Sequence, residues 1–145
     1  CGEQVPQPGA FTDADKALLA SAHGLVAKLR PLMAEQAFHR ALDAIWQVIG
    51  EADRYVDEQA PWALKKTDPA RMATVLYVLA ETVRHLAVVV QPFMPHSAAR
   101  LLDQLALPED RRSFATLGEG GALKPGTTLP KPEGVFPRYV EEAAQ

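Results

Sequence analysis

The amino-acid sequence predicts an all-α protein, an up-and-down helical bundle followed by an extended tail rich in proline and glycine. Three long segments, 13–30, 35–59 and 69–91, repeat apolar residues at a period of about 3.6 residues. No segment alternates apolar and polar residues for long enough to anchor a β-sheet. Prolines and glycines separate the helical segments, which favours neighbouring helices joined by short loops.

The first two helices are predicted from a cap and from their apolar faces. Thr12 precedes two acidic residues and is suited to cap the first helix, which we expect to end near Pro31. The second helix, over 35–59, has the longer apolar face. That face contains Phe38, Ala41, Leu42, Ile45, Trp46, Val48, Ile49, Ala52, Tyr55 and Val56. Because Trp46 lies on this stripe, we expect its side chain in the core.

The third helix, over 69–91, is apolar around much of its circumference and is therefore predicted to be central. Thr67 or Asp68 precedes it as a cap, and two prolines separate it from a short helix over 96–105. The core predicted from these patterns consists of Phe38, Leu42, Ile45, Trp46, Leu76, Leu79, Val83 and Leu86.

We divide the chain into a linker over 1–12, a helical domain over 13–107 and an extended tail over 108–145. Prolines and glycines are frequent in the tail and leave little room for a helix. Within it, Phe136 and Tyr139 are expected to pack back on the folded protein, because a stiff proline-rich segment loses little entropy on docking.

The charge and composition limit the classes of function. The chain has 145 residues and a net charge of −3, so it lacks the basic excess of a protein that grips nucleic acid by the backbone alone. It fits better a module that reads a few unpaired bases. A single cysteine suits a reducing cytosol, and no apolar run is long enough to cross a membrane. We therefore expect a cytoplasmic protein without a membrane partner.

The most informative residue is Trp62. Pro61 ends the preceding helix and holds Trp62 at a rigid corner, with Lys65 and Lys66 just beyond it. A fixed aromatic ring beside cations suits stacking on an unpaired base. Together with Arg54, the two lysines are candidates for contacts with RNA phosphates, and so is Arg40 on the same predicted helix. Ordinary solvated charge is the alternative for all four cations.

The sequence indicates neither a catalytic site nor a metal site. The four histidines are His23, His39, His85 and His96, and no pair has the i, i+4 spacing of a helical metal site. The acidic residues near Asp57 are interpreted as a solvated helix face. We therefore predict no catalytic residue, no metal ligand and no cofactor in this chain.

The segment 53–62, Asp-Arg-Tyr-Val-Asp-Glu-Gln-Ala-Pro-Trp, resembles the anticodon-binding domain of bacterial methionyl-tRNA synthetases. Three further segments are similar to parts of these enzymes in the same order. They are Phe-His-Arg-Ala-Leu at 38–42, Gln-Pro-Phe-Met-Pro at 91–95 and Val-Phe-Pro-Arg at 135–138. In that family the tryptophan at the position of Trp62 stacks on an anticodon base, so the resemblance implies the same role here. Asp53 departs from the asparagine common in the family.

The resemblance implies a fragment of an aminoacyl-tRNA synthetase, a ligase of protein biosynthesis that joins methionine to its tRNA with ATP and Mg²⁺. The catalytic motifs of the family are absent from this chain, and the first helix of its anticodon-binding domain is expected upstream of Cys1. The expected partners are the anticodon loop of methionine tRNA and the catalytic domain of the same enzyme. The alternative function is a helical protein-interaction module, with Trp62 as the hot spot for a partner helix.

Overall fold

The computed structural model describes residues 3–136 and 138. Within them the fold is helical, as predicted, and the only β-type pairing is an isolated bridge between Gln4 and Thr128. The helices are α1 (Asp13–His23), α2 (Leu25–Ala34), α3 (Phe38–Gln59), α4 (Pro61–Thr67), α5 (Pro69–Val90) and α6 (Pro95–Gln104). Short 3₁₀ turns follow at Glu109–Arg111, Phe114–Thr116 and Glu119–Gly121.

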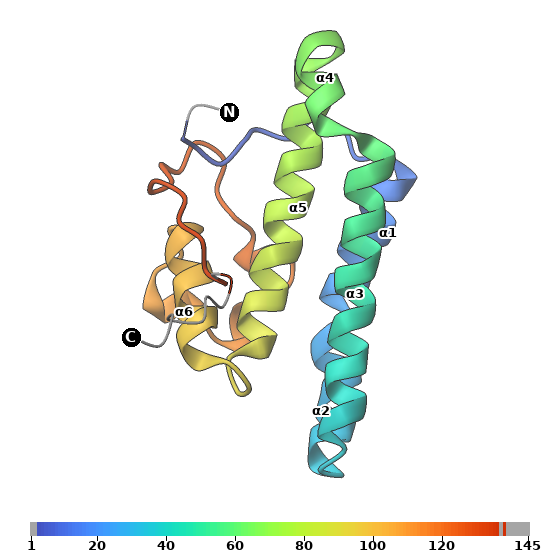
Figure 1. The fold of residues 1–145 in the computed structure, drawn as a ribbon, viewed down its shortest axis with the longest axis vertical. Coiled ribbons are helices and arrows are strands. Elements are labelled where there is room, and N and C mark those ends of the chain that lie inside the picture. Colours follow the sequence, from blue (N-terminus) through green and yellow to red (C-terminus); the bar gives the residue numbers. More distant parts are fainter. Residues whose placement is uncertain (1–2, 137, 139–145) are drawn as a thin grey trace, which may run out of the picture.

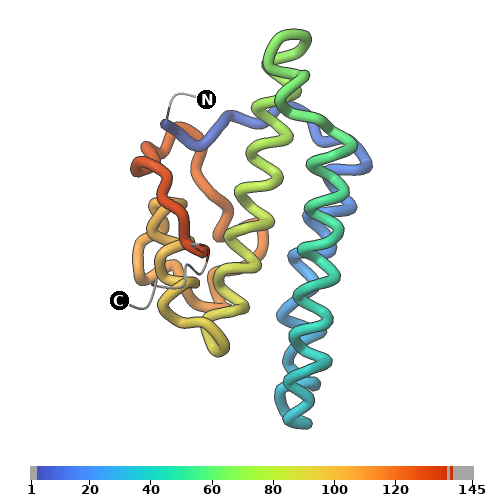
Figure 2. The backbone as a smooth tube through the Cα atoms, in the orientation of Figure 1, coloured from blue at the N-terminus to red at the C-terminus, as the bar shows by residue number. Residues whose placement is uncertain are grey.

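Helix α5 is the centre of the bundle and contacts each of the other five helices (Figure 1). Helices α1 and α2 descend along one side, α3 returns, α5 descends again and α6 turns back beside it (Figure 2). This is the predicted up-and-down order. Contrary to the expectation from the sequence, α5 is by length and composition apolar enough to span a membrane, but most of its apolar stretch is buried inside the bundle. Its composition is therefore that of a core helix.

The predicted first helix is divided into two. Helix α1 is capped by Thr12 as expected, but it ends at His23, and α2 begins after Gly24 and continues to Ala34. Pro31 lies inside α2 and does not end it, contrary to the prediction. A proline removes one helical hydrogen bond. The burial of Leu25 and Leu29 on the same helix outweighs that loss.

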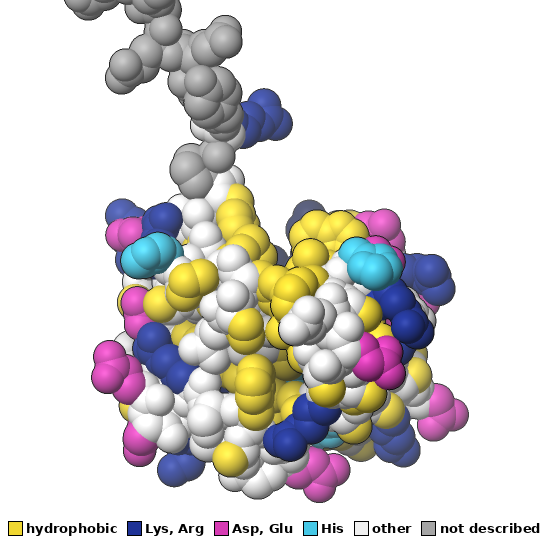
Figure 3. All heavy atoms as spheres, turned by 90° about the horizontal axis from the view of Figure 1, so that it is seen from below, with side chains coloured by type: hydrophobic (Ala, Val, Ile, Leu, Met, Phe, Trp, Pro, Cys, Tyr) yellow, Lys and Arg dark blue, Asp and Glu magenta, His cyan; other side chains and the backbone are white. Residues whose placement is uncertain are grey.

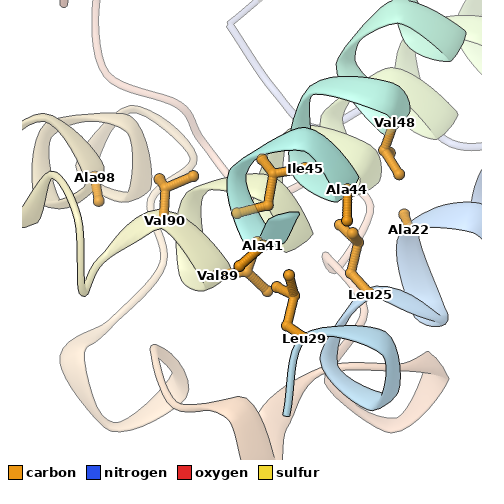
Figure 4. Close-up of a cluster of buried hydrophobic side chains, with 10 residues drawn as sticks. All are labelled: Ala22, Leu25, Leu29, Ala41, Ala44, Ile45, Val48, Val89, Val90 and Ala98. Carbon is orange, nitrogen blue, oxygen red and sulfur yellow. The ribbon is translucent and has the colours of Figure 1, made fainter. Parts of the chain in front are cut away.

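The largest hydrophobic cluster joins α2, α3 and the end of α5. Leu25 lies against Ala44, and Leu29 lies beside Ala41 and Val89 (Figure 4). Alanines on α3 let the α2 leucines approach its backbone closely. The buried members of this cluster are Ala22, Leu25, Leu29, Ala41, Ala44, Ile45, Val48, Val89, Val90 and Ala98.

The predicted core is partly wrong. Ile45 is buried as expected, and three further leucines, Leu76, Leu79 and Leu86, are partly buried. In contrast, Phe38, Leu42, Trp46 and Val83 are 49, 41, 66 and 36% exposed. The apolar stripe of α3 is wider than the face that packs on α1 and α2. The remaining part of this stripe is not packed against any other helix among the described residues.

The residues before α1 pack on the bundle. Val5 is only 2% exposed and belongs to a buried cluster with Tyr77 and Leu123. Its backbone also pairs with the tail, since its N–H donates to the Thr127 carbonyl and its carbonyl accepts from the Gly126 N–H. Whether 1–12 and 108–145 act as units separate from the helical domain stays a prediction. Their described parts make specific contacts with it.

The tail is held by polar contacts from α6. Arg100 donates to the carbonyls of Gly134 and Val135, and Gln104 exchanges two hydrogen bonds with the Glu133 backbone. Phe136 is 63% exposed, so the expected anchoring through its ring is wrong. The segment docks through backbone groups, which proline-rich chains leave available. Tyr139 lies outside the described residues.

Three buried polar side chains of α5 connect it to the segment 116–123. Arg84 donates to the Glu81 carboxylate and to the carbonyls of Thr116 and Gly118. The Leu123 N–H donates to Glu81 at 2.5 Å. His85 accepts from the Gly118 N–H through Nε2 and contacts the Glu81 carbonyl through Nδ1. Among the described residues, no buried side-chain nitrogen or oxygen lacks a partner, which meets the requirement for burying charge.

Ala60, which joins α3 to α4, adopts a left-handed conformation with φ 42° and ψ 61°. This conformation costs roughly 1–2 kcal/mol for a residue with a Cβ. It ends α3, and Pro61 then starts α4 with a φ already suited to a helix.

Acidification should destabilise this chain through His85. Burial lowers the pKa of His85 from 6.5 to about 4, and the Arg84 cation acts in the same direction. Between these pH values the unfolded chain binds a proton that the folded chain rejects, so stability falls as the pH falls, by roughly 3 kcal/mol in total. Urea unfolding at about pH 7 and at about pH 4.5, which lie above and within this pH range, measures the loss of stability. The His85→Gln variant should lose less, and an equal loss would contradict this assignment.

Glycine should be tolerated at Ala60 but not at Ala63. Ala60→Gly removes the left-handed strain of roughly 1–2 kcal/mol and adds unfolded-state entropy of about 0.4–1 kcal/mol, so the variant should be as stable as the parent sequence or slightly more stable. Ala63 lies within α4, where glycine costs about 1 kcal/mol relative to alanine. Denaturant midpoints of the two variants test this difference. Equal losses at both positions would show that the strain at Ala60 is not real.

Candidate nucleic-acid interface at the Trp62 corner

Helix α4 projects from one end of the bundle, where it rests against the first turns of α5 (Figure 1). Trp62 lies in its first turn and is 63% exposed. Lys65 and Lys66 lie in its last turn and are both exposed. Leu64 faces inward and packs against the cluster around Tyr55. The corner predicted from Pro61 is thus a short helix that displays an indole and two cations on its outer surface.

Asp68 fixes the chain where α4 passes into α5. Its side chain accepts a hydrogen bond from the Arg71 N–H at 2.9 Å, and Pro69 occupies the first position of α5. This confirms Asp68 rather than Thr67 as the cap. The segment 60–68 is therefore bounded by a left-handed residue on one side and by a capped helix start on the other.

A polar network lies beneath α4. Arg71 of α5 donates to both carboxylate oxygens of Asp15, at 2.5 and 2.7 Å. Tyr55 of α3 donates to the same carboxylate at 2.5 Å, and Arg71 also donates to Gln59 at 2.6 Å. Asp15 itself is completely buried. The network therefore joins α1, α3 and α5 just below the corner.

The network keeps Asp15 ionised. Burial alone would raise the pKa of Asp15, but hydrogen bonds from Arg71, Tyr55 and Thr12 outweigh it and lower the pKa to about 2. Burial and the bond to Asp15 raise the pKa of Tyr55 in turn, so its hydroxyl remains a donor. Because the folded pKa of Asp15 lies below its ordinary value of 3.8, this stabilisation is present above that pH and is lost only as the pH falls towards 2.

The other predicted RNA contacts lie at different distances from Trp62. Arg54 is exposed on α3 near its end, beside Glu58 and facing the groove towards α1. Arg40 lies in the first turn of α3, within 4.0 Å of Glu35. With a rise of about 1.5 Å per residue, α3 separates Arg40 from the corner by roughly 30 Å. The fold therefore gathers Trp62, Lys65 and Lys66 at one end and leaves Arg40 at the other.

The exposed apolar residues of α3 form a second surface that sequence reasoning assigned to the core. Phe38, Leu42 and Trp46 follow each other at intervals of four residues and so lie on one face of the helix. We call these three residues the α3 strip. The end of the bundle opposite α4 shows hydrophobic surface in a hollow between two halves of the molecule (Figure 3). A strip of large apolar side chains at helical spacing is typical of a helix-packing face.

Three potential metal ligands meet between α1 and α5, although no two histidines have ligand spacing in the sequence. Ligand atoms of His23, Glu81 and His85 lie within 4.8 Å of one another, and the two imidazole centroids are 4.7 Å apart. Both nitrogens of His85 already have backbone partners, and the Glu81 carboxylate already accepts from Arg84 and the Leu123 N–H. These residues fit an internal polar cluster better than a metal centre, which needs its ligand lone pairs available.

Comparison with known proteins identifies a family over nearly the whole chain. Residues 5–145 match the family described as the anticodon binding domain of methionyl tRNA ligase. The methionine–tRNA ligase of Rhizobium meliloti (strain 1021) is 58% identical over 144 residues, which are 99% of this chain and 28% of that protein. The corresponding ligase of Mycobacterium tuberculosis (strain H37Rv) is 50% identical over 140 residues, or 94% of this chain and 27% of that protein.

Solved structures agree with the fold. The apo form of Mycobacterium tuberculosis methionyl-tRNA synthetase superposes with a TM-score of 0.90 at 47% identity, over 97% of this chain and 29% of that one. The same enzyme in complex with methionyl-adenylate also gives 0.90, at 49% identity, over 94% of this chain and 27% of that one. This chain thus spans little more than a quarter of the proteins that it matches. It belongs to the family of anticodon-binding domains of methionyl-tRNA ligases.

Proposed function

We propose that this chain recognises the anticodon loop of methionine tRNA as part of a longer methionyl-tRNA ligase, with Trp62 as the stacking platform. The observation that carries the proposal is the exposure of Trp62 on a rigid corner, beside the cations of α4. Folded proteins normally bury most of so large an apolar ring. A flat ring fixed by a proline can receive a base at little entropic cost.

The charge distribution supports recognition of RNA bases rather than binding through the RNA backbone. The chain as a whole is acidic, with a net charge of −3, while α4 carries two lysines and no acidic residue. A few phosphate contacts at Lys65, Lys66 and Arg54 would position an RNA loop, while base contacts would supply the specificity. Arg40 is too remote from Trp62 to contact the same loop directly. Most of the binding energy for the whole tRNA then comes from elsewhere in the enzyme.

The longer enzyme would attach methionine to its tRNA in the cytoplasm, using ATP and Mg²⁺. Both would bind in a catalytic domain outside this chain, and this part would supply tRNA selection. The complex of the Mycobacterium tuberculosis relative with methionyl-adenylate supports that chemistry for the parent enzyme.

The α3 strip has a separate role in this proposal. The first helix of the family's anticodon-binding domain, expected upstream of Cys1, would cover Phe38, Leu42 and Trp46. The two exposed tryptophans then have different roles. Trp46 packs against the upstream helix in the whole enzyme, and Trp62 stays exposed there. If the alternative function holds and this chain binds a protein partner, the α3 strip is a better candidate surface than Trp62. Its large exposed apolar residues follow each other along one helix face.

Trp62→Ala in the parent enzyme should reduce kcat/KM for tRNA while methionine activation is unchanged. Loss of one stacking contact of about 1–3 kcal/mol corresponds to roughly 5- to 150-fold. Aminoacylation and methionine-dependent ATP–pyrophosphate exchange measure the two steps, and Trp62→Phe should retain most of the activity because it keeps an aromatic face. Equal loss in both assays would assign Trp62 to the fold. No loss in either would reject the stacking role.

The two tryptophans should differ in their effect on stability. Trp46→Ala should lower the stability of the parent enzyme by about 3 kcal/mol, as for a buried aromatic residue. In the isolated chain it should have little effect, because Trp46 is 66% exposed there. Trp62→Ala is the matched control and should leave stability nearly unchanged in both. If Trp46→Ala is equally harmless in the parent, the α3 strip is not covered by an upstream helix.

A further inference from the structure

A hydrogen bond between Gln59 and Arg71 joins the two ends of the segment that carries α4, and we call this contact the base of α4. Gln59 is the last residue of α3, and Arg71 lies in the first turn of α5. The Arg71 guanidinium donates to the Gln59 amide oxygen at 2.6 Å, so the two ends of the segment that carries Trp62 are joined directly. The segment 60–70 leaves the bundle and returns to it across this hydrogen bond, while Leu64 packs against the cluster around Tyr55.

The base is rigid because Arg71 is itself held from below. Its guanidinium makes a two-pronged ion pair with Asp15, whose other contacts come from Tyr55 and the Thr12 N–H. The Arg71 side chain is 17% exposed and that of Asp15 is completely buried. A planar guanidinium in this fork geometry has little freedom to rotate. Arg71 therefore presents a donor to Gln59 in a fixed direction.

Beyond the packing of Leu64 against the cluster around Tyr55, helix α4 has little support of its own. None of its residues is buried, and its N-terminal residue lacks a side-chain cap. Thr67 bonds only to the Ala63 carbonyl within the helix. Isolated helices of this length are not stable in water. The direction of α4, and with it the direction of the Trp62 indole, depends on the backbone at Ala60 and Asp68, on the packing of Leu64 and on the closure beneath the helix.

We propose that Arg71 is a positioning residue for tRNA recognition: held by Asp15 and Tyr55, it closes the base of α4 through Gln59 and so fixes the direction of Trp62. This proposal rests on the stacking role proposed for Trp62. Arg71 contacts no RNA in this arrangement and acts only through the corner. Its removal should therefore weaken tRNA binding without changing the chemistry of methionine activation.

The test is a double-mutant cycle in the parent enzyme. Gln59→Leu removes the closing contact and leaves the Arg71–Asp15–Tyr55 bonds in place, so it is the variant least apt to disturb folding. Arg71→Met removes the closure and its support together. Each is combined with Trp62→Ala, and KM and kcat for tRNA, ATP–pyrophosphate exchange and the thermal midpoint are measured for every variant. Arg71→Lys asks whether charge alone restores function.

Arg112→Met is the matched control. Arg112 is 18% exposed, donates to Asp103 at 2.6 Å and also bonds to the Leu107 carbonyl, so it resembles Arg71 in its own burial and in pairing with an aspartate, although Asp103 is more exposed than Asp15. It belongs to the segment after α6 rather than to the α4 base. Its loss should lower the thermal midpoint without raising KM for tRNA. A rise in KM with this control would reduce the Arg71 effect to a loss of stability.

We expect Gln59→Leu and Arg71→Met to raise KM for tRNA roughly 3- to 10-fold, in the lower part of the range for residues coupled in one network, with kcat and exchange unchanged. Arg71→Lys should be intermediate, because lysine cannot bond to Asp15 and Gln59 with the same geometry. In the Trp62→Ala background neither substitution should raise KM further. Full additivity there, or no change of KM in the single variants, would overturn the positioning role. If Trp62→Ala alone had no effect, the proposed function would fail instead.

Discussion

The burial of α5 on most of its sides is the constraint on which the rest of the structure depends. A helix placed at the centre of a small bundle must find a partner for every polar side chain that it buries. Arg84, Glu81 and His85 find theirs in the backbone of the segment 116–123, and Arg71 finds its partner in α1. The segment 116–123 of the proline- and glycine-rich tail packs on α5 for this reason. It supplies carbonyl and amide groups that no neighbouring helix could offer, because helices use their own.

Much of the helical architecture could be predicted from the sequence, since the apolar period, the Thr12 and Asp68 caps and the Pro61 corner act locally. What could not be predicted depends on contacts between distant segments. The burial of Val5 depends on pairing with 126–129. The meeting of His23 with His85 depends on the packing of α1 on α5, so spacing within one helix carried no signal for it.

The α3 strip shows a different limit. Periodicity identifies which side of a helix is apolar but not which partner covers it, so Phe38, Leu42 and Trp46 were assigned to a core that this chain does not complete. At the candidate site, Trp62 and Pro61 were accessible to prediction because a proline before an aromatic residue defines a corner by itself. The Asp15–Tyr55–Arg71–Gln59 network was not, because its members come from three helices. An acidic residue in the first turn of α1 had an ordinary explanation in helix capping.

The exposure of both tryptophans has a spectroscopic consequence. Trp46 and Trp62 are already 66 and 63% exposed in the folded chain, so unfolding changes the surroundings of both indoles only slightly. Intrinsic tryptophan emission is then a poor reporter of folding for this chain. Tyr55 and Tyr77 are buried and hydrogen-bonded, each to a single defined acceptor. Their near-ultraviolet signals, although intrinsically weaker, follow the loss of the native packing around α5, while the indoles remain available to report what approaches the surface.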